Sequence, residues 1–380
     1  MRTEKGFWVL LVLLLIVLSA QPVMAASKQG NVYHWNYHTA YDKTYFNGGS
    51  HLQSWADRVW EETKHQLKIN IFYNAGLGYK GSEVMSSLRG GMLDSAEFSA
   101  TLYASEAKQP WWLFNDFYHQ FDNWEQLKAI DNVAFPMMWK DIENYGGVKP
   151  LALFACCPKD AFQGIWMNRK IEKWSDFRGT KIRIFFSMAR KYVFDPLGFQ
   201  TLFLPGPETY QGLKTGLIDG AIQTPAAGLA GKYYEIAKYF YAFQPITSSW
   251  WGLLCSQKAF DGLPKDVQDG LVRASKAHEQ FLESEVWQDQ CKFSPGPGGS
   301  PYCERDIVGF FKKQGNVIAR VPLLSQKLRE QTTIGLKQWI AAEGGPRGQQ
   351  LMDALEKARQ ASTKIDVPVF SSLEEWKVTE

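Results

Sequence analysis

The stretch that decides the fold reads Ile171-Glu-Lys-Trp-Ser-Asp-Phe-Arg-Gly-Thr-Lys-Ile-Arg183, followed by Leu202-Phe-Leu-Pro-Gly-Pro-Glu-Thr-Tyr-Gln-Gly-Leu-Lys-Thr-Gly-Leu-Ile-Asp-Gly220. Short apolar segments within and beside it predict strands at Lys181–Phe185 and Leu217–Ile222. Further strands are predicted at Leu67–Tyr73, Lys149–Ala155, Tyr239–Phe243 and Trp250–Ser256, and longer helices at Trp124–Tyr145, Pro264–Cys291, Leu323–Glu343 and Gly348–Ala361. Because strands alternate with helices, we expect an α/β fold with open sheets.

Composition sets the class of protein. The chain has 380 residues, of which 45% are hydrophobic, and its net charge is +3. This length suits two domains or one interleaved pair, and the hydrophobic fraction argues against disorder and collagen. No run of Lys and Arg marks a nucleic-acid surface. The chain has a single long apolar run, which argues against a protein with several membrane spans.

That apolar run, Phe7–Leu18, predicts export. It follows Arg2 and Lys5 and leads to Val23-Met-Ala25, which is the pattern of a secretory signal peptide. We expect residues 1–25 to be removed and the mature protein to be soluble and exported, with a periplasmic location.

Export to an oxidising compartment allows disulfides to form among the five cysteines. Cys291 and Cys303 bracket a loop rich in Pro and Gly, and a disulfide between them would add about 3 kcal/mol of stability. Cys156 and Cys157 are adjacent and Cys255 stands alone, so one thiol stays free or pairs between chains.

Two motifs suggest other functions. Gly76-Leu-Gly-Tyr-Lys-Gly81 matches the glycine pattern of dinucleotide-binding turns, but only a short helix fits before Gly90, so we interpret it as a strand-to-helix turn. Only His34 and His38 have a spacing that would share a metal, and that spacing requires a helix where the pattern predicts a strand. The sequence contains no HExxH or GxSxG motif.

Adjacent aromatic residues suggest a cleft with aromatic walls. Trp111-Trp112, Phe185-Phe186 and Trp250-Trp251 are such pairs. Because neighbouring side chains on a strand point to opposite faces, one member of each pair would pack in the core and the other would be free to line a cleft.

The two opening segments resemble the solute-binding proteins of tripartite ATP-independent periplasmic (TRAP) transporters, the family named for the C4-dicarboxylate receptor. Members share a D-x-x-G-x-K-x-R motif, which matches Asp176–Arg183, and an E-x-Y-x-x-L-x-x-G-x-x-D-G motif, which matches Glu208–Gly220. The resemblance covers roughly residues 30–345.

This resemblance implies a type II periplasmic-binding-protein fold, in which two α/β lobes close on a ligand cleft. Residues 28–158 with about 247–285 would form lobe I, and residues 159–246 with about 286–365 would form lobe II. The helix predicted at Pro264–Cys291 would span the hinge. The implied function is not enzymatic: the protein would capture an organic acid and deliver it to a permease with one small and one large membrane subunit.

The resemblance also implies site residues in the second lobe. Arg183 aligns with the family's carboxylate-binding arginine, whose planar guanidinium can hold a carboxylate through two hydrogen bonds. Gln223 stands where many members have Asn. Gln163 stands where sialic-acid receptors have a second arginine and close to a glutamine of the keto-acid receptors. The missing arginine favours a monocarboxylate, and an aromatic, hydroxy or keto group on it is compatible with the pattern. A bridging Na⁺ or Ca²⁺ held by Gln163 is left open.

Further contacts are implied by alignment. Asn36, Phe98 and Ser99 match contact positions of the first lobe. Where some members have a stacking Phe this chain has Gly206, and another aromatic would compensate: Trp166, Phe186 or Trp250. An exported enzyme or a ligand-sensing receptor on the same scaffold remains the alternative function.

Overall fold

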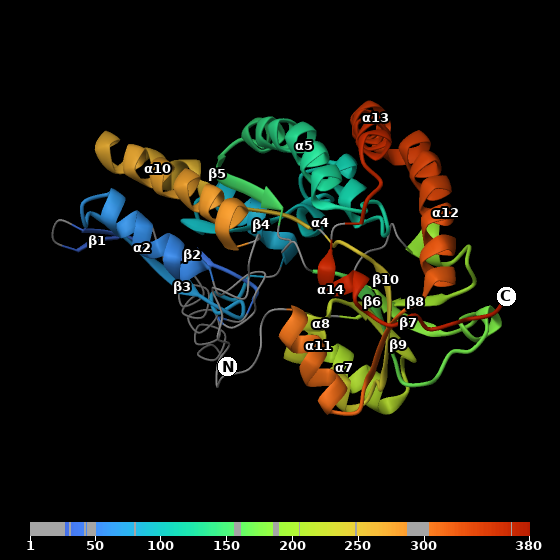
Figure 1. Ribbon diagram of the computed structural model, residues 1–380. Coiled ribbons are helices and arrows are strands. Elements are labelled where there is room, and N and C mark those ends of the chain that lie inside the picture. Colours follow the sequence, from blue (N-terminus) through green and yellow to red (C-terminus); the bar gives the residue numbers. More distant parts are fainter. Residues whose placement is uncertain are drawn as a thin grey trace, which may run out of the picture.

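Figure 1 shows the computed structural model of the chain, which has two mixed β-sheets with helices around them. The structure describes residues 27–29, 32–41, 43, 51–79, 81–155, 161–184, 190–204, 206–247, 249–286, 304–365 and 367–380. The predicted signal peptide, Phe186, Cys156, Cys157 and the predicted Cys291–Cys303 disulfide lie outside these residues.

The first sheet has the strand order β1-β2-β4-β11-β5, with β3 paired to the other side of β2. Its strands are β1 (Ser27–Gln29), β2 (Val32–His38), β3 (Leu67–Phe72), β4 (Ser95–Ser99), β5 (Val148–Ala155) and β11 (Trp250–Ser256). β11 is antiparallel to both of its neighbours, β4 and β5.

The second sheet has the order β12-β10-β6-β9-β7-β8. Its strands are β6 (Gln163–Met167), β7 (Lys181–Ile184), β8 (Gln200–Phe203), β9 (Gly220–Gln223), β10 (Tyr239–Gln244) and β12 (Val317–Arg320). β7 runs parallel to β8 and β9, whereas β6 is antiparallel to β9 and β10.

Helices cover both faces of the first sheet. On one face lie α2 (Leu52–Glu62) and α10 (Lys265–Phe281), which continues as a π-helical turn, η6 (Leu282–Val286). On the other face lie α3 (Val84–Gly90) and α5 (Trp124–Tyr145), whose core runs on into the second sheet. The remaining elements between β4 and α5 are α4 (Ala100–Tyr103) and the 3-10 helix η2 (Pro110–Asp116).

The second sheet is packed against α7 (Gly206–Thr215), α8 (Pro225–Ala230) and α11 (Glu304–Lys313). α9 (Gln257–Asp261) follows β11, and the short α14 (Pro368–Ser371) precedes the chain end. The other short turns are the 3-10 helices η1 (Gly81–Glu83), η3 (Trp174–Asp176) and η5 (Tyr233–Glu235) and the π-helical η4 (Arg190–Phe194).

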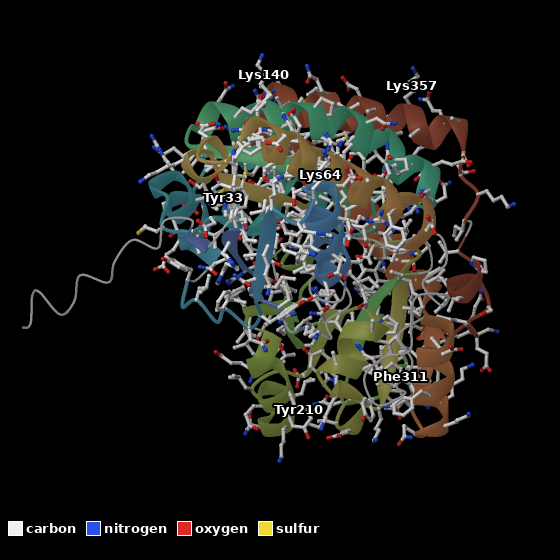
Figure 2. The ribbon with its side chains drawn as sticks, turned by 90° about the vertical axis from the view of Figure 1, so that its left-hand side faces the viewer. Tyr33, Lys64, Lys140, Tyr210, Phe311 and Lys357 are labelled. Atoms are coloured by element: carbon white, nitrogen blue, oxygen red, sulfur yellow. The ribbon has the colours of Figure 1, made fainter. Side chains whose placement is uncertain are left out.

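Two C-terminal helices contact both halves of the molecule. α12 (Pro322–Trp339) packs against η4 and β10 of the second half, and a π-helical turn, η9 (Ile340–Gly344), leads from it to α13 (Gly345–Ala361). α13 packs along α5 of the first half. Figure 2 shows this pair from the side, with Lys140 of α5 and Lys357 of α13 at one end of the molecule and Tyr210 of α7 at the other.

The structure confirms the α/β fold class and its two lobes. β11 and α5 have the predicted bounds, Trp250–Ser256 and Trp124–Tyr145. α10 packs against α2 and β5, and the last residues of the predicted Pro264–Cys291 helix lie beyond the described part. The segment Gly76–Gly81 lies between β3 and η1, where Gly78 has a φ of +83°, a conformation that favours glycine. Cys255 is free and buried.

Candidate functional site

Three of the predicted site residues lie at one edge of the second sheet. Arg183 pairs with Ala221 across β7 and β9, and Gly164 pairs with Gln223 across β6 and β9. Since β6 is antiparallel to β9, Gln163 at its start lies at the edge where β7 and β9 end. Arg183 and Gln223 lie on the same face of the sheet, because Gln223 is two residues beyond Ala221.

Arg183 is the central charge of this edge. Its side chain is fully buried, and its Nε donates to the Leu204 carbonyl oxygen at 2.9 Å. This bond ties the guanidinium to the chain just after β8. An arginine stays charged in such surroundings because its pKa is above 12 in proteins, and a buried positive charge favours an anionic ligand.

A segment between α4 and α5 reaches this edge from the first lobe. The Tyr118 ring makes edge-to-face contacts with Phe194 of η4, at 5.4 Å between centroids, and with Phe243 of β10, at 6.0 Å. The Tyr118 carbonyl oxygen accepts a 2.6 Å hydrogen bond from Thr332 of α12. Burial raises the pKa of the Tyr118 hydroxyl, a negative Asp116 would raise it further, and the nearby charge of Arg183 lowers it.

Asp116 lies two residues before Tyr118 at the end of η2. Its Oδ1 accepts a 2.6 Å hydrogen bond from the Thr101 hydroxyl of α4. Burial raises the pKa of Asp116 to about 8, although the bond from Thr101 lowers it in part. At neutral pH the carboxyl group is therefore protonated. Neither Asp116 nor Tyr118 was predicted from the sequence, which carries no local motif for them within the aromatic-rich segment 111–121.

The predicted contacts of the first lobe lie on β2 and at the end of β4. The Asn36 backbone N–H donates to Asp94 Oδ2 at 2.9 Å, and burial raises the pKa of Asp94 to about 6. Phe98 is enclosed in the core, with its ring 5.2 Å from that of Trp112. Ser99 is the N-cap residue of α4, two residues before Thr101.

The two predicted tryptophans are enclosed by other side chains. Trp166 lies on the same face of the second sheet as Arg183, since both pair with Ala221. The Trp166 ring lies 4.8 Å from Phe240 and 4.9 Å from Phe311, measured between centroids. The Trp250 Nε1 donates to Asp131 Oδ1 at 3.0 Å on the α5 side of the first sheet. These surroundings are those of packing residues.

The adjacent aromatic pairs differ from expectation in one respect. Trp250 and Trp251 do point to opposite faces of β11, but both side chains are buried, because helices cover both faces of the first sheet. Trp111 and Trp112 are also both buried, and they lie on η2 instead of on a strand.

Within the described ranges, no group of three or more His, Cys, Asp or Glu side chains is placed to hold a metal ion. Gln163, for which a bridging cation was considered, is half-buried at the start of β6. The cation stays a prediction.

Two α/β lobes of this kind define the type II periplasmic-binding-protein class of fold. The chain belongs to the DctP family, described as bacterial extracellular solute-binding protein, family 7, which it matches over residues 39–292. It is thus a member of the solute-binding protein family of TRAP transporters, as the sequence motifs predict.

Several known proteins are similar to it. The 2,3-diketo-L-gulonate-binding periplasmic protein YiaO of Escherichia coli is 24% identical over 250 residues, which cover 63% of this chain and 71% of YiaO. DctP6 of Bordetella pertussis, described as an extracytoplasmic solute receptor binding pyroglutamic acid, has a TM-score of 0.70 and 24% identity, covering 85% of this chain and 99% of DctP6.

A TRAP solute-binding protein from Sulfitobacter sp. NAS-14.1 was solved with bound β-D-galacturonate. It has a TM-score of 0.68 and 19% identity, covering 86% of this chain and 99% of that protein. At these identities the solved structures support the fold. Among the helices that the structure describes, none combines the length and apolar character needed to cross a membrane.

Proposed function

We propose that this protein is the exported substrate-binding subunit of a TRAP-type secondary transporter and captures an organic monocarboxylate in the periplasm. The observation that carries the proposal is the position of Arg183, a fully buried cation at the edge of the second sheet. Its guanidinium would hold the ligand carboxylate, with the amides of Gln163 and Gln223 at the same edge.

Capture would proceed by closure of the two lobes. A ligand that binds the closed form better than the open form shifts the population toward closure. The segment that carries Tyr118 supports this mechanism, since it belongs to the first half of the chain but packs against Phe194 and Phe243 of the second.

The similar proteins favour acids of this chemistry. DctP6 is described as binding pyroglutamic acid, and the Sulfitobacter protein was solved with galacturonate, each of which carries one carboxylate. A closed receptor would then deliver its ligand to a permease with a small and a large membrane subunit. The experiment that separates transport from sensing is reconstitution with the membrane proteins encoded beside its gene.

Binding itself is tested by a thermal-shift screen of the purified exported protein against organic acids, with and without Na⁺ or Ca²⁺. A ligand at 100 times its Kd stabilises the folded state by about 2.7 kcal/mol, which is readily measured. We expect shifts with particular monocarboxylates, and no shift with the same acids in Arg183→Ala. Wild-type shifts in that variant would overturn the assignment of Arg183. A shift that requires a cation would support the role of Gln163 in holding it.

A further inference from the structure

The segment from Asp116 to Tyr118 carries two buried polar groups that the proposed carboxylate site does not use. Within the described residues, Asp116 Oδ2 and the Tyr118 hydroxyl have no hydrogen-bond partner, and both atoms are buried. The two side chains are only 5% and 4% exposed. Buried polar atoms without a partner are rare in folded proteins, so such a pair calls for an explanation.

Both groups are held in place by other bonds. Thr101 of α4 donates to Asp116 Oδ1, which leaves Oδ2 as the oxygen without a partner. The Tyr118 ring is fixed between Phe194 and Phe243, and its carbonyl oxygen accepts from Thr332. A phenol fixed in this way has little freedom to find a protein partner by turning.

The electrostatics of Tyr118 link this pair to the carboxylate site. The charges of both Asp116 and Arg183 affect the pKa of its hydroxyl, so the three groups share one electrostatic environment. The polar side chains of Thr101, Asp116 and Tyr118 therefore link α4 of the first lobe with the electrostatic surroundings of Arg183 on β7.

We propose that Asp116 and Tyr118 form a donor pair that recognises a second oxygen of the ligand, carried by an oxo, hydroxy or lactam group near the carboxylate. This inference rests on the proposed function, because the carboxylate is taken to be held by Arg183. The ligand class becomes an oxygen-substituted monocarboxylate, and a plain aliphatic acid is discriminated against.

Asp116 and Tyr118 can donate hydrogen bonds to a ligand oxygen only while both side chains carry their proton. Burial raises the pKa of Asp116 to about 8, so at pH 7 the carboxyl group is neutral and can donate from Oδ2. The Thr101 hydroxyl on α4 contacts this carboxyl group, and both Asp116 and Arg183 affect the pKa of the Tyr118 hydroxyl. The Tyr118 pKa is raised, so this phenol stays protonated over the same range. A plain acid leaves both donors without an acceptor, and unsatisfied polar groups are the strongest source of discrimination in such sites.

The test compares matched acids by calorimetry: L-pyroglutamate with cyclopentanecarboxylate, pyruvate with propionate, and 2-oxoisovalerate with isovalerate. We expect the wild-type protein to prefer the oxygenated member of at least one pair by tenfold or more, which corresponds to about 1.4 kcal/mol. Asp116→Ala and Tyr118→Phe should each reduce that preference about tenfold. Asp116→Asn is the matched control, since its amide accepts from Thr101 and still donates.

A pH series gives an independent readout. The wild-type preference should fall above pH 8, as Asp116 ionises, whereas that of Asp116→Asn should not change. Thermal midpoints near that of the wild type verify that each variant is folded.

Different results would overturn the carboxylate site at Arg183 and the donor pair of Asp116 and Tyr118. Loss of all binding in Arg183→Ala, with equal affinities for both members of every pair in the wild type, would overturn the donor pair and leave the receptor function standing. An undiminished preference in both Asp116→Ala and Tyr118→Phe would also overturn the donor pair. If Arg183→Ala binds as the wild type does, or if none of the six acids binds the wild type, the carboxylate site and this inference fall together.

Discussion

The guanidinium of Arg329 donates to both carboxylate oxygens of Asp122, with an Nη1–Oδ2 distance of 3.0 Å. Asp122 lies just after the segment that carries Tyr118, and Arg329 belongs to α12. This ion pair therefore holds the segment 116–122 against the C-terminal helix α12. Arg359 of α13 adds two hydrogen bonds to the Gln120 carbonyl oxygen. The position of Tyr118 thus depends on residues more than 200 positions later in the chain.

Replacing Arg329 by Ala should destabilise the protein and weaken ligand binding together. Asp122 is 5% exposed and would lose its charged partner, which costs about 1.5–3 kcal/mol for hydrogen bonds to charged groups. Chemical denaturation gives the stability and calorimetry gives the Kd. Arg273→Ala is a suitable control, since it removes a more exposed pair with Glu62. Unchanged affinity in Arg329→Ala would show that the segment is positioned without this pair.

Replacing Arg183 by Lys should weaken acid binding at least about tenfold while the fold is retained. A lysine keeps the charge but cannot bind a carboxylate through two parallel bonds. It also lacks the Nε that donates to Leu204. Circular dichroism verifies the fold, and calorimetry with the best acid from the screen measures the loss. Equal affinities of the two proteins would contradict bidentate recognition.

Stability should decrease as pH rises from 6.5 to 8.5, in part because of Glu97. This carboxyl group accepts hydrogen bonds from the Thr39 hydroxyl and the Ala40 N–H, and burial raises its pKa to about 8 from an ordinary 4.5. Between these values the folded protein retains a proton that the unfolded chain releases. A group of this kind stabilises fully below pH 4.5, and its contribution is lost as pH rises to 8, by at most about 1.4 kcal/mol per pH unit.

Glu97→Gln should therefore show a shallower fall of the thermal midpoint over this range. Asp116 and Asp131, with pKa values raised to about 8 and 7, act in the same direction and keep some slope. The buried His51 and His119 have pKa values lowered to about 4 and 3, and their effect on stability lies below pH 6.5. The exposed Glu356 offers a control, Glu356→Gln, which should keep the wild-type slope. Parallel curves for the wild type and Glu97→Gln would contradict the assignment.

Gly228→Ala should destabilise the protein by about 1–3 kcal/mol, the usual cost of overpacking a core. A methyl group at Gly228 of α8 would collide with the Trp166 indole, which is enclosed between β6, β10 and α11. Gly309→Ala on α11 is the matched control, because no atom lies within 4 Å of the added carbon. Thermal unfolding of both variants measures the difference, and equal midpoints would show that Trp166 has room to move.

Much of the fold could be predicted because its signals are local. The alternation in Trp250–Ser256 and the periodicity of Trp124–Tyr145 mark β11 and α5 with their observed bounds. The predicted strand Leu217–Ile222 begins too early, since Gly216 has a positive φ and Leu217 is exposed, so that β9 begins only at Gly220.

The candidate site was predictable only in part. Arg183, Gln163 and Gln223 could be singled out because their motifs are contiguous segments, and the pairing of β6, β7 and β9 brings them to one edge. Asp116 and Tyr118 could not, since their role depends on contacts with η4, β10 and α12. No pattern within one segment encodes such contacts.

The place of β11 in the first sheet also constrains the order of folding. β11 lies between β4 and β5 and pairs with both, although five strands of the second sheet precede it along the chain. Until residue 256 has emerged, β4 and β5 each have an unpaired edge, and such edges attract other chains. The first sheet is therefore completed only after five strands of the second sheet have been synthesised.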